Sequence, residues 1–359
     1  MASSLTLRAG PDALALVRER GLRVDDIDVL PGASGGAKWL AIAGLDRWLF
    51  GEFLQARTRP LHCIGSSIGS WRMACLAQRD PVAALARGHH AYIYEQHYSP
   101  RPDTAEVTRV LGRCLDLLLG LTGVDEILAH PWVRLHVITA EGRGLAASAR
   151  RSTLMAALAL AAAGNLVTRR SLALQLRRCV FHSAGDTTPF AHLADLPTRH
   201  VALTHDNLRA ALLASGSIPL LVEGVRIDEP GAQDAPAGGV HWDGGVLDYH
   251  LDLDFGSGDG IVLYPHFYPH VVPGWFDKAL RWRRAGARNF RRALLVAPSA
   301  DFVAALPGGK IPDRRDFYAM PHAKRERRWQ GVLDASRRLG DEMRELVATG
   351  RVADAVRPW

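Results

Sequence analysis

Short apolar runs alternate with helix-like patterns along most of this chain, and this alternation is the strongest constraint on its fold. The runs that we expect to form strands cover residues 27–30, 61–64, 133–139, 179–182, 201–203, 261–264 and 294–297. Helical patterns extend from Ala37 toward Phe53, from Ser67 onward and from Asn207 to Ala214. Strands that alternate with helices favour a mostly parallel sheet with helices on both faces. The sequence therefore predicts an α/β fold.

The chain is long enough for one large domain. It has 359 residues, of which 48% are hydrophobic, and no shift in composition marks a linker. We expect residues 1–298 to form the α/β domain that carries the site, and residues 299–359 to form a helical C-terminal extension packed on it. The segment 229–239 is rich in Pro, Gly, Ala and Asp, which is typical of an exposed loop.

Basic residues outnumber acidic ones, with 44 Lys and Arg against 37 Asp and Glu. This excess favours anionic partners such as phospholipid surfaces or acyl carriers. No recognised nucleic-acid-binding module accompanies the charges, so nucleic acid is not an expected partner. The N-terminus has no charged segment followed by a long apolar one, and we therefore expect no signal peptide and a cytoplasmic location.

The cysteines and histidines show no pattern typical of a metal site. No two cysteines have the C-x-x-C spacing, and we expect free buried thiols in a reducing compartment. His89, His90 and His97 do not match H-E-x-x-H and are interpreted as polar groups of the surface or core. The sequence predicts neither a metal nor another cofactor. The four cysteines are Cys63, Cys75, Cys114 and Cys179.

The segment Gly65-Ser66-Ser67-Ile68-Gly69 lies between a predicted strand and a predicted helix. A G-x-S-x-G motif in this context forms a tight turn, the nucleophile elbow, in which the glycines relieve backbone crowding. The serine oxygen then projects beside a helix N-terminus, where unpaired N–H groups can stabilise an oxyanion. The motif makes Ser67 a candidate nucleophile for acyl hydrolysis or acyl transfer, although a Gly- and Ser-bearing turn can also match it by chance.

Two other glycine segments accompany this motif. Upstream, Gly32-Ala33-Ser34-Gly35-Gly36-Ala37-Lys38 connects the strand at 27–30 to its helix, so backbone N–H groups there can approach a ligand oxygen. Its spacing is not that of a phosphate loop, which leaves an oxyanion hole or a glycine turn used only for packing. Downstream, Asp243-Gly244-Gly245 presents a carboxylate on an open turn or is an ordinary Asp-Gly turn.

The three segments and their order resemble the patatin-like phospholipase family over residues 27–250. A fourth stretch, from Ala214 to Pro219, is similar to the small-residue segment with a proline ahead of that family's aspartate. The resemblance implies a three-layer α/β/α fold and a catalytic dyad of Ser67 and Asp243. It also implies roles for other matched residues, namely an oxyanion hole from Gly35, Gly36 and Ile68 and substrate contacts from Lys38 and Pro219.

The sequence departs from the family's pattern at several positions. Ser34 stands where the family has its first glycine, and Trp39 where it has its last. Tyr249-His250-Leu251 replaces an Asn-x-Pro after the aspartate. The dyad is retained, and the departures concern the N–H donors of the loop and the shape of the acyl pocket.

The activity that the resemblance implies is hydrolysis of lipid-type acyl esters, with Asp243 accepting the Ser67 proton directly. Two alternatives remain open at this point. One is a non-catalytic lipid- or membrane-binding protein on the same scaffold. The other is a Ser-His-Asp esterase. Its remaining members would come from Asp186 or Asp195 and from His241, His250 or His266.

Two further segments have helical patterns. Residues 154–168 are apolar and Ala-rich but shorter than a membrane span, and we expect a buried core helix there, with a lid or membrane-touching helix as the alternative. Residues 275–292 separate apolar from basic side chains at the helical period. This second pattern predicts an amphipathic helix that either packs on the sheet or contacts an anionic membrane.

Overall fold

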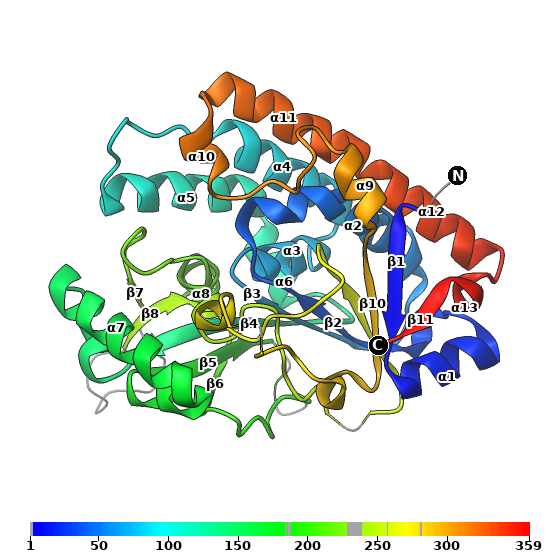
Figure 1. The fold of residues 1–359 in the computed structure, drawn as a ribbon, viewed down its shortest axis with the longest axis horizontal. Helices are drawn as coiled ribbons and strands as arrows, with labels where there is room; N and C mark the ends of the chain where they lie inside the picture. Colours follow the sequence, from blue (N-terminus) through cyan, green and yellow to red (C-terminus); the bar gives the residue numbers. More distant parts are fainter. Residues whose placement is uncertain (1–2, 184, 186–187, 228–238, 257, 281) are drawn as a thin grey trace.

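The computed structural model describes the chain except residues 1–2, 184, 186–187, 228–238, 257 and 281. Its centre is one mixed, mostly parallel sheet that helices flank in a three-layer α/β/α arrangement (Figure 1). The strand order is β11-β1-β10-β9-β2-β3-β4-β5-β6, and β8 joins β4 while β7 joins β8. The strands are β1 (Leu5–Ala9), β2 (Ile27–Gly32), β3 (Leu61–Ser66), β4 (Val133–Gly142), β5 (Leu176–His182), β6 (Thr198–Ala202), β7 (Val225–Arg226), β8 (Val240–Asp243), β9 (Ile261–Pro265), β10 (Ala293–Pro298) and β11 (Val356–Pro358).

The helices come from all parts of the chain. The first of two groups is α1 (Pro11–Arg20), α2 (Ala43–Gly51), α3 (Ile68–Leu76), α4 (Pro81–Tyr94), α5 (Thr104–Leu119), α6 (Gly123–Leu128) and α7 (Arg151–Val167). The second is α8 (Leu208–Ser215), α9 (Ala300–Ala305), α10 (Asp316–Ala319), α11 (His322–Ala335), α12 (Arg337–Ala348) and α13 (Val352–Ala355). Helices α2, α4, α11 and α12 pack together along one side of the sheet, so the C-terminal helices cover helices from the first quarter of the chain (Figure 1).

The structure confirms the predicted α/β class, and each of the seven predicted strands lies on an observed strand. The sequence patterns missed β1, β7, β8 and β11. Residues 299–359 are mostly helical, but they end in β11, which pairs in parallel with β1 through Leu7 and Val356. The C-terminal segment thus completes the edge of the central sheet as well as covering it. The four cysteines are buried and free, as expected.

The length of β4 brings two distant strands to one place. Its first residues pair with β3 as far as Ser66, which lies opposite Ile138. The next residue of β4, Thr139, pairs with Asp243 of β8, which runs antiparallel to β4. Along β4, the pairing with β8 therefore begins at the position after the pairing with β3 ends. Neighbouring strands lie only about 4.8 Å apart. This register brings Asp243 to the residue that follows β3, which is Ser67.

Two helix predictions need correction. Helix α7 forms, but it is not a buried core helix: it covers a small apolar cluster beside β4 and β8, and much of its apolar surface faces outward. Its buried side chains are Leu154, Ala157, Ala161 and Asn165.

The predicted helix over residues 275–292 is wrong. Among the described residues of this range, only Trp275–Asp277 and Ala287–Phe290 form helical turns, and both are of the 3-10 type. Asp277 is buried and accepts a hydrogen bond from Asn165. Such tertiary contacts override the local helical propensity of this segment. Trp282, expected on the buried face, is 72% exposed.

Some predictions fall on residues outside the described part of the chain. These are the loop at 229–239, apart from Gly239, together with Asp186 and Arg281. Within the described residues, no helix combines the length and apolar character needed to cross a membrane.

Candidate active site

Ser67 occupies a strained turn at the end of β3. Its φ of 55° and ψ of −130° lie outside the regions that residues with side chains prefer. The backbone N–H of Ser67 donates to Ser215 Oγ at 2.8 Å, and Ser215 Oγ donates to the carbonyl of Ile138 at 2.7 Å. Ser215 therefore connects the strained turn to β4, and the turn has the geometry of a nucleophile elbow.

The two glycines of the motif are required by close backbone contacts. A Cβ at Gly69 would lie 1.9 Å from the carbonyl oxygen of Gly32, and a Cβ at Gly65 would lie 2.4 Å from the Cα of Ser70. Neither position can hold a side chain without a backbone shift. The same contact brings the end of β2, and with it the glycine-rich loop, against the start of α3.

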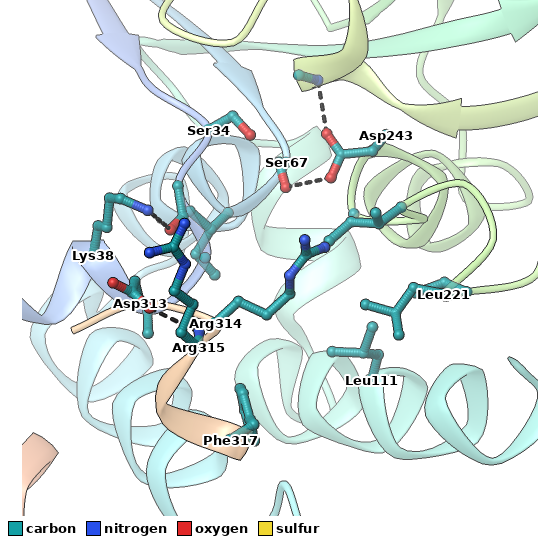
Figure 2. A pocket seen from close by; sticks show the side chains of 18 of the residues that line it. Ser34, Lys38, Ser67, Leu111, Leu221, Asp243, Asp313, Arg314, Arg315 and Phe317 are labelled. Atoms are coloured by element: carbon teal, nitrogen blue, oxygen red, sulfur yellow. Dashed lines mark hydrogen bonds between the residues drawn. The ribbon is translucent and has the colours of Figure 1, made fainter. Parts of the chain in front are cut away.

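Asp243 forms a direct hydrogen bond with Ser67. Ser67 Oγ donates to Asp243 Oδ2 at 2.7 Å, and the N–H of Gly245 donates to Asp243 Oδ1 at 2.7 Å (Figure 2). Both side chains are buried. Burial raises the pKa of the Asp243 carboxyl to about 6, against the opposing effect of these two hydrogen bonds. Near neutral pH the carboxylate is mostly ionised and is basic enough to accept a proton from a serine hydroxyl.

The predicted oxyanion hole lies beside this pair. Gly36 has a φ of +56°, which favours glycine, and it begins the 3-10 turn Gly36–Ile42. Ile68 begins α3, where N–H groups lack intrahelical acceptors. In the described part of the chain, the N–H groups of Gly35, Gly36 and Ile68 donate to no acceptor. All three residues line the same cavity as Ser67 and Asp243.

That cavity has a volume of about 900 Å³. Lys38 lines it, as expected; its Nζ donates to the carbonyl of Gly35 at 3.3 Å, and burial lowers its pKa. Pro219 does not line the cavity, contrary to expectation. It is buried in the turn after α8, while Ile218 and Leu221 of that turn face the cavity, because the direction of side chains reverses within a turn.

The described residues of the alternative triad form no hydrogen bond with Ser67. His241 shares a hydrogen bond with Thr139 at 2.9 Å, and burial lowers its pKa to about 4. His250 lines the cavity, but its Nδ1 accepts from the N–H of Val272. His266 Nδ1 accepts from the N–H of Tyr268. None of the three histidines hydrogen-bonds to Ser67 in the described part of the chain.

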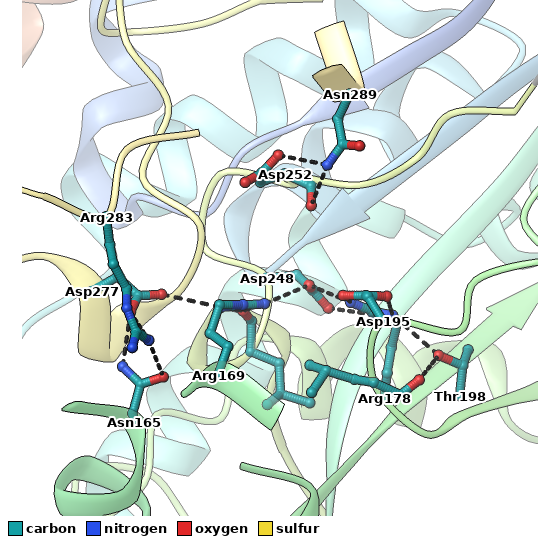
Figure 3. A network of polar contacts seen from close by, with 12 residues as sticks. Asn165, Arg169, Arg178, Asp195, Thr198, Asp248, Asp252, Asp277, Arg283 and Asn289 are labelled. Atoms are coloured by element: carbon teal, nitrogen blue, oxygen red, sulfur yellow. Dashed lines mark hydrogen bonds and ion pairs between the residues drawn. The ribbon is translucent and has the colours of Figure 1, made fainter. Parts of the chain in front are cut away.

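Asp195, the described carboxylate of that triad, is exposed and belongs to a polar network that includes the buried Arg178 and Asp248 (Figure 3). Arg178 pairs with Asp195 at 2.7 Å and with Asp248 at 2.7 Å. Arg169 pairs with Asp277 at 3.1 Å and donates to the carbonyl of Leu247. The network anchors the segment that follows Asp243 and the turn that carries Asp277.

One group of described residues has the composition of a metal site. His97, His322 and Glu326 place their ligand atoms within 4.8 Å of one another. His97 and His322 are exposed, and His97 Nε2 already contacts Glu326 Oε1 at 2.6 Å. Of the other two histidines, His89 is buried and His90 is exposed, which agrees with their interpretation as core and surface groups.

Sequence reasoning missed three residues at the site. Ser215 was part of a recognised segment but had no assigned role. Lys278 and Arg314 line the cavity and act electrostatically on Asp243. Lys278 was assigned to the exposed face of a helix that does not form, and Arg314 belongs to the C-terminal extension, so no local signal connected either residue to the motifs.

Comparisons of this chain with known protein families, curated proteins and solved structures found no match. The inference of function therefore depends on the geometry described above.

Proposed function

We propose that this protein is a serine acyl-ester hydrolase that uses Ser67 as nucleophile and Asp243 as base. The observation that carries the proposal is the 2.7 Å hydrogen bond from Ser67 Oγ to Asp243 Oδ2, at an elbow that faces a large cavity. The resemblance of the motifs to patatin-like phospholipases supports the same conclusion. The apolar part of the cavity wall, which includes Leu111 and Leu221, suits the acyl chain of a lipid-type ester (Figure 2).

The reaction follows from this arrangement. Ser67 Oγ attacks the ester carbonyl carbon while its proton passes to Asp243 Oδ2. The carbonyl oxygen becomes an oxyanion, which the N–H groups of Gly35, Gly36 and Ile68 would stabilise. The intermediate collapses, and the departing alcohol takes the proton from Asp243. Water then attacks the acyl-serine and gives its proton to Asp243, and the acid leaves as Ser67 regains its hydrogen.

A fluorophosphonate probe tests the assignment, because it labels activated serines covalently. We expect the label on Ser67, and we expect Ser67→Ala to abolish both labelling and hydrolysis of p-nitrophenyl butanoate. Ser66→Ala is the matched control, since Ser66 Oγ is buried and has no hydrogen-bond partner in the described part of the chain. Undiminished labelling of Ser67→Ala would contradict the proposal. Lipid binding by a wild-type protein that neither labels nor hydrolyses would favour the non-catalytic alternative.

A further inference from the structure

The cavity beside Ser67 holds an excess of positive charge. Its described lining has only two carboxylates, Asp243 and Asp313. Asp313 pairs with Lys310 at 3.0 Å and accepts a hydrogen bond from the backbone N–H of Arg315 at 2.7 Å. The cationic side chains of the lining are Lys38, Lys278, Arg284, Arg314, Arg315 and Arg325.

Five of these six cations form no ion pair with any described residue, namely Lys38, Lys278, Arg284, Arg314 and Arg315. The contacts of Lys278 Nζ are with aromatic rings, at 3.7 Å from the centroid of Tyr249 and 5.7 Å from that of Trp275. Arg325 differs, because it donates to the carbonyl of Gln96 and stacks on Phe317 and Trp329. Arg325 therefore has structural partners. Of the five other cations, Lys38, Lys278 and Arg314 act electrostatically on one another.

The three cations lie close to one another and to the dyad. Burial, with the neighbouring charges of Lys38 and Arg314, lowers the pKa of Lys278 to about 7. The charges of Lys278 and Arg314 also act on Asp243. Partly buried cations that repel each other destabilise the folded protein unless an anion compensates them. Such groups in a cleft are typical of a binding site.

Lys278 is also held in place. It directly follows Asp277, which is buried and accepts a hydrogen bond from Asn165 Nδ2 at 2.7 Å (Figure 3). Arg169 and Arg283 pair with the same carboxylate at 3.1 and 3.5 Å. A side chain carried by such a turn is preorganised to bind a ligand.

We propose that Lys38, Lys278 and Arg314 form an anion subsite that binds a phosphate group of the ester substrate beside Ser67. The proposal depends on the proposed hydrolase function. Lys38 lies to one side of the Ser67–Asp243 pair and Leu111 and Leu221 lie across from it, with Arg314 and Arg315 between them (Figure 2). The cavity can therefore take an amphiphilic ester with its phosphate on the cationic side and its acyl chain on the apolar side.

Paired substrates that differ only in a phosphate test this subsite. Monoacylglycerol and lysophosphatidic acid with the same acyl chain form a lipid pair, and their butanoyl counterparts form a soluble pair. We expect kcat/KM to be at least about tenfold higher for the phosphate-bearing member, as one lost charge-assisted contact implies. If the phosphate-bearing member is preferred in the lipid pair alone, the phosphate belongs to a lipid headgroup. If it is preferred in both pairs, the subsite also accepts the phosphate of soluble esters.

Lys278→Met should remove most of that preference, so that the ratio of kcat/KM between the phosphate-bearing and the neutral member of each pair falls toward one; this ratio is the readout, because Lys278 also acts on Asp243 and can change both rates together. Lys324→Met is the matched control, because Lys324 is exposed and lies outside the cavity lining. Equal loss on both members of a pair, or no preference in the wild type, overturns the subsite. Failure of Ser67 to react with a fluorophosphonate overturns the hydrolase itself, so the two failures are distinguishable. Binding of glycerol 3-phosphate to Ser67→Ala, measured by calorimetry, should weaken at least tenfold when Lys278→Met is added.

A second surface carries an independent inference. Among the residues that the structure describes, ten large hydrophobic residues are exposed, and six of them lie on α7 and the turns beside it. Trp282 is adjacent, because Arg283 donates to Asn165 and to the carbonyl of Leu166 at the end of α7. We call this set the α7 surface. Its other members are Leu145, Met155, Leu160, Leu166, Val167 and Leu174.

The charged residues of the segment that carries most of the α7 surface are all positive. Residues 142–185 contain seven arginines and neither Asp nor Glu. The exposed ones that form no ion pair with described residues are Arg143, Arg150, Arg151 and Arg170. Exposed apolar side chains beside unpaired arginines match an anionic lipid surface, with the apolar groups in the acyl region and the arginines at the headgroups.

The α7 surface is also next to the cavity. Trp275 lines the cavity and packs against the apolar cluster under α7. Arg151 donates to the carbonyl of Leu220, and the next residue, Leu221, lines the cavity. We propose that the α7 surface docks on an anionic bilayer, which brings the cavity close to lipid.

Sedimentation with vesicles tests the docking. Wild-type protein should bind phosphatidylcholine vesicles that contain phosphatidylglycerol, and salt should weaken binding. The double variant Leu166→Ser, Val167→Ser should bind at least threefold less, whereas Leu121→Ser, an exposed leucine of another region, should bind normally. Equal binding by all three proteins overturns the proposal. Self-association through the α7 surface without vesicle binding would assign it to a second copy of the chain and also overturn it.

Discussion

The raised pKa of Asp243 predicts how kcat/KM depends on pH. Its pKa of about 6 is the value for the free enzyme, which kcat/KM reports. Only the ionised carboxylate can accept the Ser67 proton. At pH 5 about one tenth of the carboxylate stays ionised, and at pH 4 about one hundredth. We therefore expect kcat/KM for p-nitrophenyl butanoate to fall about tenfold for each pH unit below 6, with a plateau above 7.

The substrate for this measurement is neutral, so the charges of Lys278 and Arg314 do not act on its binding. Asp243→Asn should lower the plateau by at least about a hundredfold, the lower end for loss of a general base, and should abolish the limb near pH 6. A midpoint near 3.8, the ordinary value for an aspartate, would refute the argument that burial tunes the base. If kcat/KM of Asp243→Asn still falls with a midpoint near pH 6, the titrating group is not Asp243. Circular dichroism across the range separates titration from acid unfolding.

Three further predictions concern stability and positioning. Burial raises the pKa of Asp243 from 3.8 to about 6, so the folded state binds this proton more tightly than the unfolded state. The ionised carboxylate therefore lowers the free energy of unfolding above pH 6, and this loss disappears as the pH falls toward 4. Asp243→Asn should therefore be more stable than wild type at pH 8, by up to about 3 kcal/mol in urea unfolding, and a less stable variant at that pH contradicts this. Asp46→Asn leaves Arg72 without the bidentate partner that it contacts at 2.8 and 2.6 Å with both side chains fully buried, so it should cost about 3–5 kcal/mol. Asp12→Asn breaks the equally short but exposed pair with Arg291 and should cost less than about 1 kcal/mol; similar costs in the two variants would show that burial is not the cause. Ser215→Ala removes the acceptor of the Ser67 N–H, so kcat should fall while KM stays within twofold, and an unchanged kcat would show that the elbow holds without it.

The strands and the elbow were accessible from sequence because their signals are local. Apolar runs bounded by turn residues identify buried strands wherever they pair. The glycines at 65 and 69 could be recognised because only glycine tolerates the backbone contacts that this turn makes with Ser70 and Gly32. The motif alone therefore predicted where Ser67 would lie, at a strand end beside a helix N-terminus.

The helix expected over residues 275–292 shows where a local signal fails. Its apolar and basic residues follow the helical period, but that period does not reveal what a buried carboxylate will contact. Asp277 finds Asn165 and Arg169, more than 100 positions away in the sequence, and these contacts hold the chain in short turns. Lys278 consequently lies in the cavity rather than on a solvated helix face.

By itself, the sequence determined the α/β class, the buried strands and the strained turn at Ser67, because periodicity and glycine contacts are properties of neighbouring residues. Only the tertiary structure decided which groups meet that turn. Asp243 reaches Ser67 because β4 extends beyond the end of β3 and pairs with β8 from the next position onward. Arg314 reaches the same cavity because the C-terminal segment folds back over the sheet. Which strands pair, and which distant segments pack together, depends on contacts between residues far apart in the sequence.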